Sequence, residues 1–368
     1  GGFGGVGLGG RGTVRVDTGG TVLVAGGSEL NTGTLHVGRT AGAEGTVAVN
    51  GPGSELNVSG VTDLGALGSL GVLSFEDGST NNALGTVYVG FDSAADSRGL
   101  LQVIEGAWTS AGSLHVGGLG AGNVGEVLVG GDDSRLALLG SAAFTLGSAS
   151  GTTGFLTVDS GGTFSSGGGA TTISATGTVL ANGKYTNNGT LNIVGGTFTS
   201  NGFFSLGVGD TMTGSAGAQV AFGGSLFVSN GNTVEMSTGA DLSLGGGLQM
   251  ASGGDGTVII DGSGTALTTN TAAGTASIFG SNGGAASVTV RNQASAAFGG
   301  AGISLAPTSN NAASATFNIQ SDADVSSNTV DVATGDNGTG TLNIDGAGST
   351  LSINGAHALN VGSSAGGS

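Results

Sequence analysis

The stretch GTLNIDGAGSTLSINGAHALNVG, residues 340–362, decides the fold. It holds three short runs in which apolar and polar residues alternate, Thr341–Ile344, Thr350–Ile353 and Ala358–Val361, with glycine-bearing corners between them. The same pattern occurs in GTVAVNGPGSELNVSGVTDLG (residues 45–65) and in GTVIIDGSGTALTTNTAAGTASIFG (residues 256–280). A unit of two or three strands that recurs every few dozen residues is typical of one coil of a parallel β-solenoid.

The spacing of the repeats predicts how many strands each coil contains. One clear coil begins at Gly125 and the next at Gly154. Four later starts follow one another at a similar spacing: Gly256, Ala286, Ala315 and Gly340. A step of this length fits three strands and three corners, so we expect an all-β, right-handed parallel β-helix (β-solenoid) of about 12–14 coils, mostly with three strands per coil.

The middle of the chain has a shorter repeat. Similar phrases begin at Gly177, Gly189 and Gly202, much closer together than the starts elsewhere, and we expect single strands joined by short turns. No linker or charge block interrupts the pattern. We therefore predict one continuous solenoid over residues 1–368, with regular coils in 1–165, irregular short-repeat coils in 166–250, regular coils in 251–368, and open repeats at both ends.

Alternation within the strands predicts which side chains face inward. Three early strands are expected at Thr13–Val16, Thr21–Val24 and Thr34–Val37, with their valines and leucines of one parity inside. In the next coil we expect Val47 and Val49, then Leu56 and Val58, to face the core. The stretch Val61–Thr80 is less regular, and its expected core residues are Leu64, Leu67, Leu70, Val72 and Leu73.

The composition limits the partners and the location of the protein. Lys and Arg number only 7 against 24 Asp and Glu, and the formal net charge is −17. Such a surface repels a phosphate backbone and an anionic membrane, so we expect no nucleic-acid binding. No run reaches the roughly 18 apolar residues of a transmembrane helix, so we expect no membrane insertion of this segment. A chain with 8% charged residues and no cysteine is typical of extracellular, exported bacterial surface proteins.

Histidines and acidic residues are the candidates for a chemical site. His36 and His115 occupy the same place in Leu-His-Val-Gly, where alternation predicts outward, solvated positions, and His357 stands at a corner. Three scattered histidines do not form a zinc site. The acidic candidates lie in or beside corners: Asp92 with Asp96, Asp132 with Asp133, Asp322 with Asp324, and Asp336.

Calcium is the one metal that we keep open, because a loop such as GGDDS could supply some of the six to eight oxygens that it needs. The segment GGDGTVIID, residues 253–261, looks like part of a calcium-binding array, but the nonapeptide repeat of such arrays is missing. A polysaccharide-degrading enzyme would need paired carboxylates, and Asp132–Asp133 with nearby Arg135 is the best match. We expect no enzyme activity and assign no catalytic, cofactor-binding or metal-binding residue.

Ice binding would need a flat face of aligned threonines. The outward positions of the main strands show no such column: Arg15, His36, Ala48, Asn57, Tyr88, Gln102, His115 and Asn343. We therefore expect an irregular polar face.

The repeats resemble the passenger regions of bacterial autotransporters and related surface β-helix proteins. The resemblance rests on the phrase G-T-[VL]-x-[VI]-x-G-x-G-S-x-L-x-[VI] at Gly45–Val58 and Gly340–Ile353. It also rests on the LxVG element at Leu35–Gly38, Leu114–Gly117 and Leu359–Gly362, and on NNGTLNIVGGTFTSNG at residues 187–202. Weak forms of the pattern cover most of the chain, but the membrane-embedded barrel of that family is absent from it.

The resemblance and the composition together imply a structural or adhesive extracellular rod on a bacterial surface, as part of an adhesin or autotransporter passenger. Because both ends are open repeats, a self-assembling filament subunit that stacks end to end is a second hypothesis. The alternative is a β-helix protein that binds or degrades polysaccharide. The expected ligands are glycans or the surfaces of host or sister cells, and no cofactor is expected.

Overall fold

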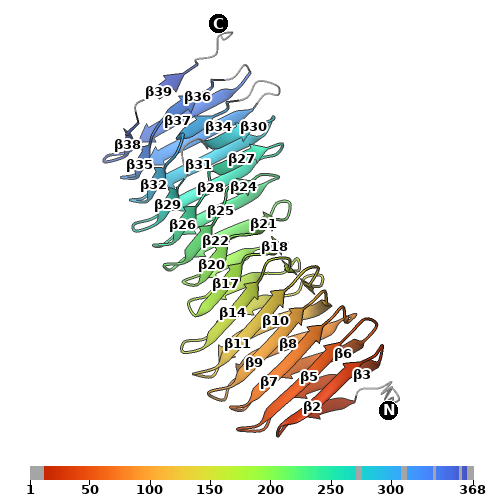
Figure 1. The fold of residues 1–368 in the computed structure, drawn as a ribbon. Helices are drawn as coiled ribbons and strands as arrows, with labels where there is room; N and C mark the ends of the chain where they lie inside the picture. The colour runs from red at the N-terminus through yellow and green to blue at the C-terminus, as the bar shows by residue number, and fades with distance from the viewer. Residues whose placement is uncertain (1–11, 271–275, 308–312, 335–336, 356–358, 363–368) are drawn as a thin grey trace. The chain divides into compact units, whose positions relative to one another are not determined.

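The computed structural model describes residues 12–270, 276–307, 313–334, 337–355 and 359–362. Within them all regular structure is β-strand and none is helical, so they contain no helix long and apolar enough to cross a membrane. Parallel strands stack as a β-solenoid of about 13 turns, as the repeats predict (Figure 1). By contacts the chain divides into an N-terminal unit (residues 1–191 and 196–204) and a C-terminal unit (residues 192–195 and 205–368).

Two parallel sheets, which we call sheet A and sheet B, make up the N-terminal unit. The strands of sheet A are β1 (Thr13–Val16), β3 (Glu29–Thr32), β4 (Thr34–Val37), β6 (Glu55–Leu64), β8 (Leu84–Asp92), β10 (Trp108–Leu119), β12 (Arg135–Leu138), β13 (Phe144–Leu146), β15 (Thr163–Ser165), β16 (Thr171–Ser174) and β18 (Lys184–Asn187). The strands of sheet B are β2 (Gly20–Ala25), β5 (Glu44–Asn50), β7 (Leu70–Glu76), β9 (Arg98–Ile104), β11 (Val124–Gly130), β14 (Thr153–Val158), β17 (Gly177–Ala181) and β20 (Thr197–Ser200). The division between the units falls within β19 (Leu191–Val194) and β21 (Phe203–Leu206).

In the C-terminal unit each complete coil contributes one strand to each of three parallel sheets. The strands of sheet A are β22 (Thr211–Ser215), β25 (Asn232–Ser237), β28 (Gly256–Asp261), β31 (Ala285–Arg291), β34 (Ser314–Gln320) and β37 (Thr339–Asp345). Those of sheet B are β23 (Gln219–Phe222), β26 (Asp241–Leu244), β29 (Ala266–Thr269), β32 (Ser295–Phe298), β35 (Asp324–Ser327) and β38 (Thr350–Ile353). Those of sheet C are β24 (Leu226–Val228), β27 (Leu248–Ser252), β30 (Ser277–Ser281), β33 (Ile303–Leu305), β36 (Val330–Val332) and β39 (Leu359–Val361).

The strand register confirms the coil starts read from the repeats. Gly154 of β14 pairs with Gly125 of β11, the start of the preceding coil. In the C-terminal unit the same pairing joins the four predicted starts in order: Gly256, Ala286, Ala315 and Gly340. Equivalent residues of successive repeats therefore lie one above the other, which is what lets one coil bury the apolar side of the next.

The short repeats near residue 180 were only partly predicted. We expected single strands joined by turns, but the phrase that begins at Gly177 supplies two strands, β17 and β18. A coil still takes three strands, so it becomes shorter: Thr178 pairs with Thr197, a smaller step along the chain than the one from Gly125 to Gly154. The shorter coil has lost mainly corner residues, because its strands β17, β18 and β19 have five, four and four residues while β11, β12 and β13 of the longer coil have seven, four and three.

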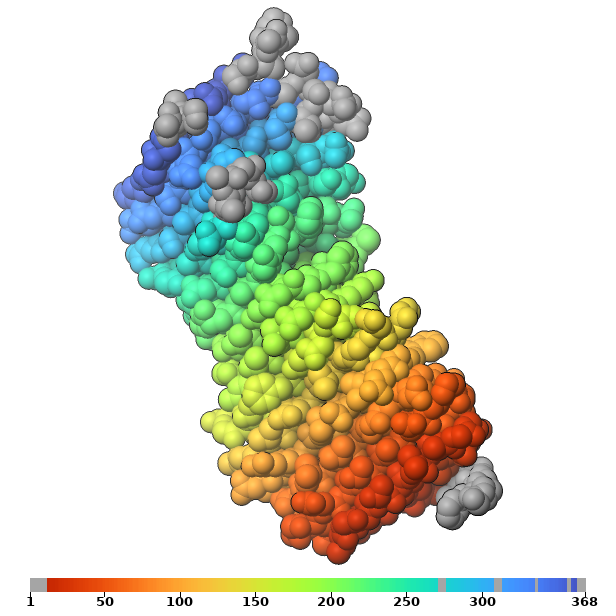
Figure 2. Space-filling model, viewed as in Figure 1, coloured from red at the N-terminus to blue at the C-terminus, as the bar shows by residue number. Residues whose placement is uncertain are grey.

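The inward side chains form continuous columns in both units. In the N-terminal unit Leu35, Val47 and Leu56 are completely buried, as alternation predicts. Farther along the chain inward residues are aromatic: Phe164 and Tyr185 pair in one column, Phe144 lies beside them on β13, and the Phe144–Phe164 and Phe164–Tyr185 ring centroids are each 5.2 Å apart. The colour sequence of Figure 2 shows that within each unit a coil contacts the coils next to it in sequence. Burial against these neighbours is the main stabilising contribution.

The expected core of residues 61–80 was wrong at three positions. Leu64 and Leu73 are buried, but Leu67 is 47% exposed and Leu70 and Val72 are half-buried on the outward side of β7. The register explains the error, because Gly71 pairs with Gly45 of the preceding coil and so faces inward. Inward parity then falls on Gly71, Leu73 and Phe75, the last of which is completely buried.

Candidate functional site

In-register stacking arranges the outward side chains of sheet A in columns on the N-terminal unit. One column, the His36 column, consists of Arg15, His36, Asp63, Tyr88, His115, Thr145 and Thr172. A second, the Trp108 column, consists of Glu29, Glu55, Thr80, Trp108, Arg135, Thr163 and Lys184. Neighbouring strands lie about 4.8 Å apart, so side chains in a column touch those of the next coil. Both columns carry chemically diverse residues and are the candidate functional surface.

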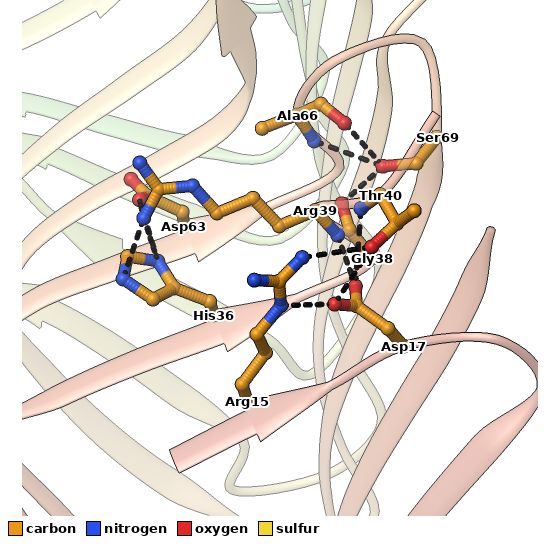
Figure 3. Close-up of polar contacts among 9 residues, drawn as sticks. All are labelled: Arg15, Asp17, His36, Gly38, Arg39, Thr40, Asp63, Ala66 and Ser69. Atoms are coloured by element: carbon orange, nitrogen blue, oxygen red, sulfur yellow. Dashed lines mark hydrogen bonds and ion pairs between the residues drawn. The ribbon is translucent and has the colours of Figure 1, made fainter. Parts of the chain in front are cut away.

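The first coils of the His36 column hold a network of polar contacts (Figure 3). The imidazole Nδ1 of His36 lies 2.8 Å from a carboxylate oxygen of Asp63 on the next coil. Its Nε2 lies 2.7 Å from the Arg39 guanidinium. Arg15 is paired with Asp17 and also donates to the Thr40 hydroxyl at 2.7 Å. Parallel stacking brings these residues together from separate strands and corners.

The contacts of His36 determine its protonation. The carboxylate of Asp63 can only accept, so Nδ1 carries the hydrogen, and the guanidinium can only donate, so Nε2 accepts. Burial and the nearby charge of Arg39 lower the pKa of His36, against the opposing effect of Asp63. The neutral imidazole has both nitrogens engaged, which leaves no lone pair for a metal ion or for a substrate proton.

Asp17 is likewise held as a structural anion. It accepts hydrogen bonds from the backbone N–H groups of Arg39 and Thr40 and from the side chains of Arg15 and Thr40. Burial raises the pKa of this carboxyl, but these hydrogen bonds outweigh burial and hold the pKa below its ordinary value. At the same corner the Ser69 hydroxyl contacts the carbonyl oxygens of Gly38 and Ala66 (Figure 3). The network fixes the corner.

Aromatic rings follow in the His36 column. The ring of His115 stacks on Tyr88, with centroids 5.1 Å apart and an interplanar angle of 18°, and it lies 5.4 Å from Phe91. Its Nδ1 is 2.8 Å from the Thr145 hydroxyl. Burial lowers the pKa of His115. The prediction of an outward position was right for His36 and His115, but neither is freely solvated, because each lies against the side chains of adjacent coils.

The acidic pairs predicted in the N-terminal unit are corner residues. Asp92 ends β8 and accepts the backbone N–H of Leu67 at 2.7 Å. Asp96 and Asp133 have positive φ, 61° and 64°, a conformation that Asp tolerates better than most residues. Among the described residues, neither Asp132 nor Asp133 forms an ion pair with Arg135, which begins strand β12 of sheet A.

The acidic residues of the C-terminal unit bond to neighbouring coils. In the calcium-like segment, Asp261 pairs with Arg291 at 2.9 Å and accepts from Asn292 at 2.7 Å. Asp324 accepts from the Thr350 hydroxyl at 2.7 Å, while Asp322 lies in a corner with a φ of 66°.

No three metal-binding side chains come together in the described part of the chain. His357 and Asp336 lie outside it. The structure therefore does not bring the sequence candidates into one site.

A threonine column does exist, contrary to our expectation. Sheet A of the C-terminal unit stacks hydroxyl residues outward in successive coils: Thr211, Thr233, Thr257, Ser287, Thr316 and Thr341. Most of them directly follow the first glycine or alanine of a repeat. The outward positions that we compared in the sequence did not include this one. The next outward column is irregular, since Glu235, Ile259 and Asn318 occupy it with threonines. Sheet A of this unit thus lacks a second aligned threonine row in its described coils.

Trp108 is the residue that sequence reasoning missed. It is the one tryptophan of the chain, it is 55% exposed, and it lies between Thr80 and Arg135 in its column. The signal was present in AWTSA, because Ala107 and Thr109 are of inward parity and Trp108 is not.

No protein-family model matches the sequence, and neither does any curated protein.

Proposed function

We propose that the chain is a structural and adhesive segment of an exported bacterial surface protein, of the kind whose passenger repeats it resembles. The observation that carries the proposal is the surface of stacked columns, on which each coil adds a different outward side chain about 4.8 Å from the last. Such a surface offers many weak contacts in a fixed array, which suits adhesion to a repetitive partner.

The arrangement of the candidate residues favours adhesion over polysaccharide degradation. A glycosidase needs two carboxyl groups that flank one bond, in a cleft and with separated pKa values. Asp132 and Asp133 lie in a solvent-exposed corner. His36 uses both ring nitrogens within the protein. Of the two polysaccharide alternatives, we therefore retain binding and not degradation.

Adhesion can be tested with the purified chain. We expect it to bind to intact bacterial or host cells, or to glycans displayed on an array, and to retain binding after removal of divalent cations. Failure to bind cells, glycans and sister cells would leave only the role of a stalk. Hydrolysis of a polysaccharide by the wild-type chain, lost in Asp132→Ala and Asp133→Ala variants, would favour the enzyme instead.

A second candidate function is end-to-end self-association, and one observation favours it. In the coil of β37 to β39, Ile344, Leu359 and Val361 are 50%, 45% and 68% exposed. Their partners in the preceding coil, among them Ile319 and Val332, are buried. A second copy that stacked its own coil here would cover these apolar side chains. Sedimentation should then show species larger than the monomer.

A further inference from the structure

The Trp108 column changes chemical character along the N-terminal unit. Its first two residues, Glu29 and Glu55, are acidic. From β10 onward it consists of Trp108, Arg135, Thr163 and Lys184, in four consecutive coils. At about 4.8 Å per coil these four side chains span about 14 Å. We call this part of the column the Trp108 strip.

One exposed aromatic ring belongs to the strip, and a second lies against its last residue. The Trp108 side chain stands on the outward side of β10, and large exposed aromatic side chains commonly mark binding surfaces. At the other end the Lys184 ammonium lies 5.5 Å from the centroid of Phe203, which is 60% exposed. This cation–π contact holds the ammonium above the surface.

The two cations of the strip, Arg135 and Lys184, lack an ion-pair partner within the described part of the chain. The adjacent outward column contains Ala137, Ser165 and Thr186, which are small and carry no charge. The net charge of the chain is −17, so most of its surface repels anions. The strip differs locally, because its two cations form no ion pair with a described residue and can attract an anionic ligand.

We propose that the Trp108 strip binds an acidic polysaccharide, one that carries carboxylate or sulfate groups, along the stacking direction. The indole of Trp108 packs on the apolar C–H face of a sugar ring. The guanidinium of Arg135 binds an anionic group in bidentate fashion, Lys184 binds a second one, and the Thr163 hydroxyl lies between them to bond sugar hydroxyls. The inference rests on the proposed adhesive function and names its ligand class.

Other occupants fit the strip less well. Nucleic acid would gain only two phosphate contacts and would meet the repulsion of the whole chain. The shallow groove on sheet B, about 440 Å³, is lined by Leu100, Leu128 and Phe155 together with Gln102, Glu126 and Thr157. It offers no cation to an acidic ligand and presents the Glu126 carboxylate instead. An acidic polypeptide could match the charges, but it presents no flat apolar ring to Trp108, so it serves as a comparison probe.

The test measures binding of the full chain to polygalacturonate, dextran and polyglutamate by calorimetry or biolayer interferometry. We expect binding to polygalacturonate that weakens with added NaCl, and at least fivefold weaker binding to the other two, on the scale of one lost charged or aromatic contact. Trp108→Ala and Arg135→Gln should each weaken polygalacturonate binding about fivefold or more. Two exposed side chains of sheet B serve as matched controls, and Phe155→Ala and Arg98→Gln should leave binding unchanged.

Three results would overturn the proposal: no binding to polygalacturonate, equal loss in the control variants, or binding of polyglutamate by the wild-type chain that is as strong as its binding of polygalacturonate. Thermal unfolding of each variant shows that it is folded. Adhesion to cells is measured on the same variants. If Trp108→Ala and Arg135→Gln still adhere while polygalacturonate does not bind, the adhesive function stands and the strip is refuted. If neither the wild-type chain nor any variant adheres to cells, the proposed adhesive function itself is refuted.

Discussion

Two glycines meet at the corner that leads from sheet A to sheet B in the N-terminal unit. Gly117 ends an LxVG element with a φ of 61°, a conformation that costs glycine little. Gly125 has an ordinary φ, but a Cβ on it would lie 2.2 Å from the carbonyl oxygen of Val89 and 2.4 Å from the nitrogen of Gly117. Gly125, the first residue of its coil, is therefore glycine because the backbone approaches closely there, and not because the chain turns there.

This packing predicts the effect of one methyl group. Gly125→Ala should destabilise the N-terminal unit by about 3 kcal/mol, because backbone atoms must move to admit the Cβ. Gly168→Ala is the matched control in the same unit, since its Cβ would meet its nearest atom, the Gly140 oxygen, at an ordinary 3.4 Å. It should change stability by less than about 0.5 kcal/mol. Urea unfolding followed by circular dichroism measures both, and equal losses would contradict the packing argument.

The histidines of the His36 column predict a pH dependence of stability. Burial lowers the pKa of His36 and of His115 from the ordinary 6.5, so the unfolded chain takes up these protons at a pH at which the folded chain does not. Stability should be complete above about pH 6.5 and should fall as the pH decreases below it. The charged neighbours act in opposite directions on His36, since Arg39 lowers its pKa and Asp63 raises it.

A double variant tests this assignment. His36→Gln with His115→Gln removes both titrations, so its melting temperature should fall less than that of the wild type between about pH 7 and pH 5. The lowered pKa of Asp17 adds a separate loss only as the pH falls below the ordinary 3.8. Parallel curves for the double variant and the wild type between pH 7 and pH 5, read by differential scanning fluorimetry, would show that other groups control the acid response.

At the scale of the element, the cluster of aromatic rings inside the N-terminal unit contains an unfavourably buried polar group. Tyr185 of β18 is completely buried between Phe164 and Phe198, with centroids 5.2 Å away from each. Its hydroxyl interacts with that of Thr171, which opposes the effect of burial on the pKa, but neither hydroxyl has a hydrogen bond of ordinary geometry with a described residue. Burial raises the pKa of this phenol, so it stays neutral. A buried hydroxyl without a partner lowers stability.

Removing that hydroxyl should therefore strengthen the stack. Tyr185→Phe keeps the ring and its contacts, so we expect a gain in unfolding free energy of about 1 kcal/mol. Tyr88→Phe, at a half-exposed position, is the control and should have an effect within about 0.5 kcal/mol. Chemical unfolding monitored by tyrosine and tryptophan fluorescence gives both values. A loss on Tyr185→Phe would mean that a hydrogen bond to the hydroxyl stabilises the core.

Comparison of elements shows what the sequence could predict. Coil starts and inward parity were predicted correctly where Val or Leu alternates behind a glycine, as at Val47 and Val49, because stacking demands the same pattern in each coil. Prediction failed where glycine itself takes the inward place: Gly71 shifted the expected parity of its strand and turned Leu70 and Val72 outward. Strand β3 was missed because its Glu, Leu, Asn and Thr alternate weakly.

The candidate surface was less predictable than the fold. Contacts such as His36 with Asp63 join residues of successive coils, and their meeting depends on the exact length of the chain between them. Alternation shows only that a side chain faces outward. It does not show which outward side chain lies beside it, and this is why His36 and His115 were expected to be solvated and why Trp108 and Arg135 were not connected.

At the scale of the whole molecule, two properties oppose each other in self-association. The net charge of −17 makes copies repel, while the exposed apolar side chains of the β37–β39 coil favour stacking of a second copy. Repulsion between like-charged copies is screened within about 8–10 Å at physiological salt, whereas apolar burial does not weaken. We therefore expect association to increase with NaCl concentration, which is the opposite of the salt dependence expected for the Trp108 strip.

Ile344→Lys tests whether that coil is the contact. The side chain is 50% exposed and lies on the last described sheet A strand, so the substitution should leave the fold intact while it places a charge in the stacking surface. Sedimentation velocity at low and high salt should show larger species for the wild type at high salt and monomer for Ile344→Lys at both. Phe227→Lys, at a 64% exposed position on β24 of sheet C, away from the β37–β39 coil, is the control and should associate like the wild type. Association that persists in Ile344→Lys, or a wild-type chain that stays monomeric at every salt and protein concentration, would contradict end-to-end stacking through this coil.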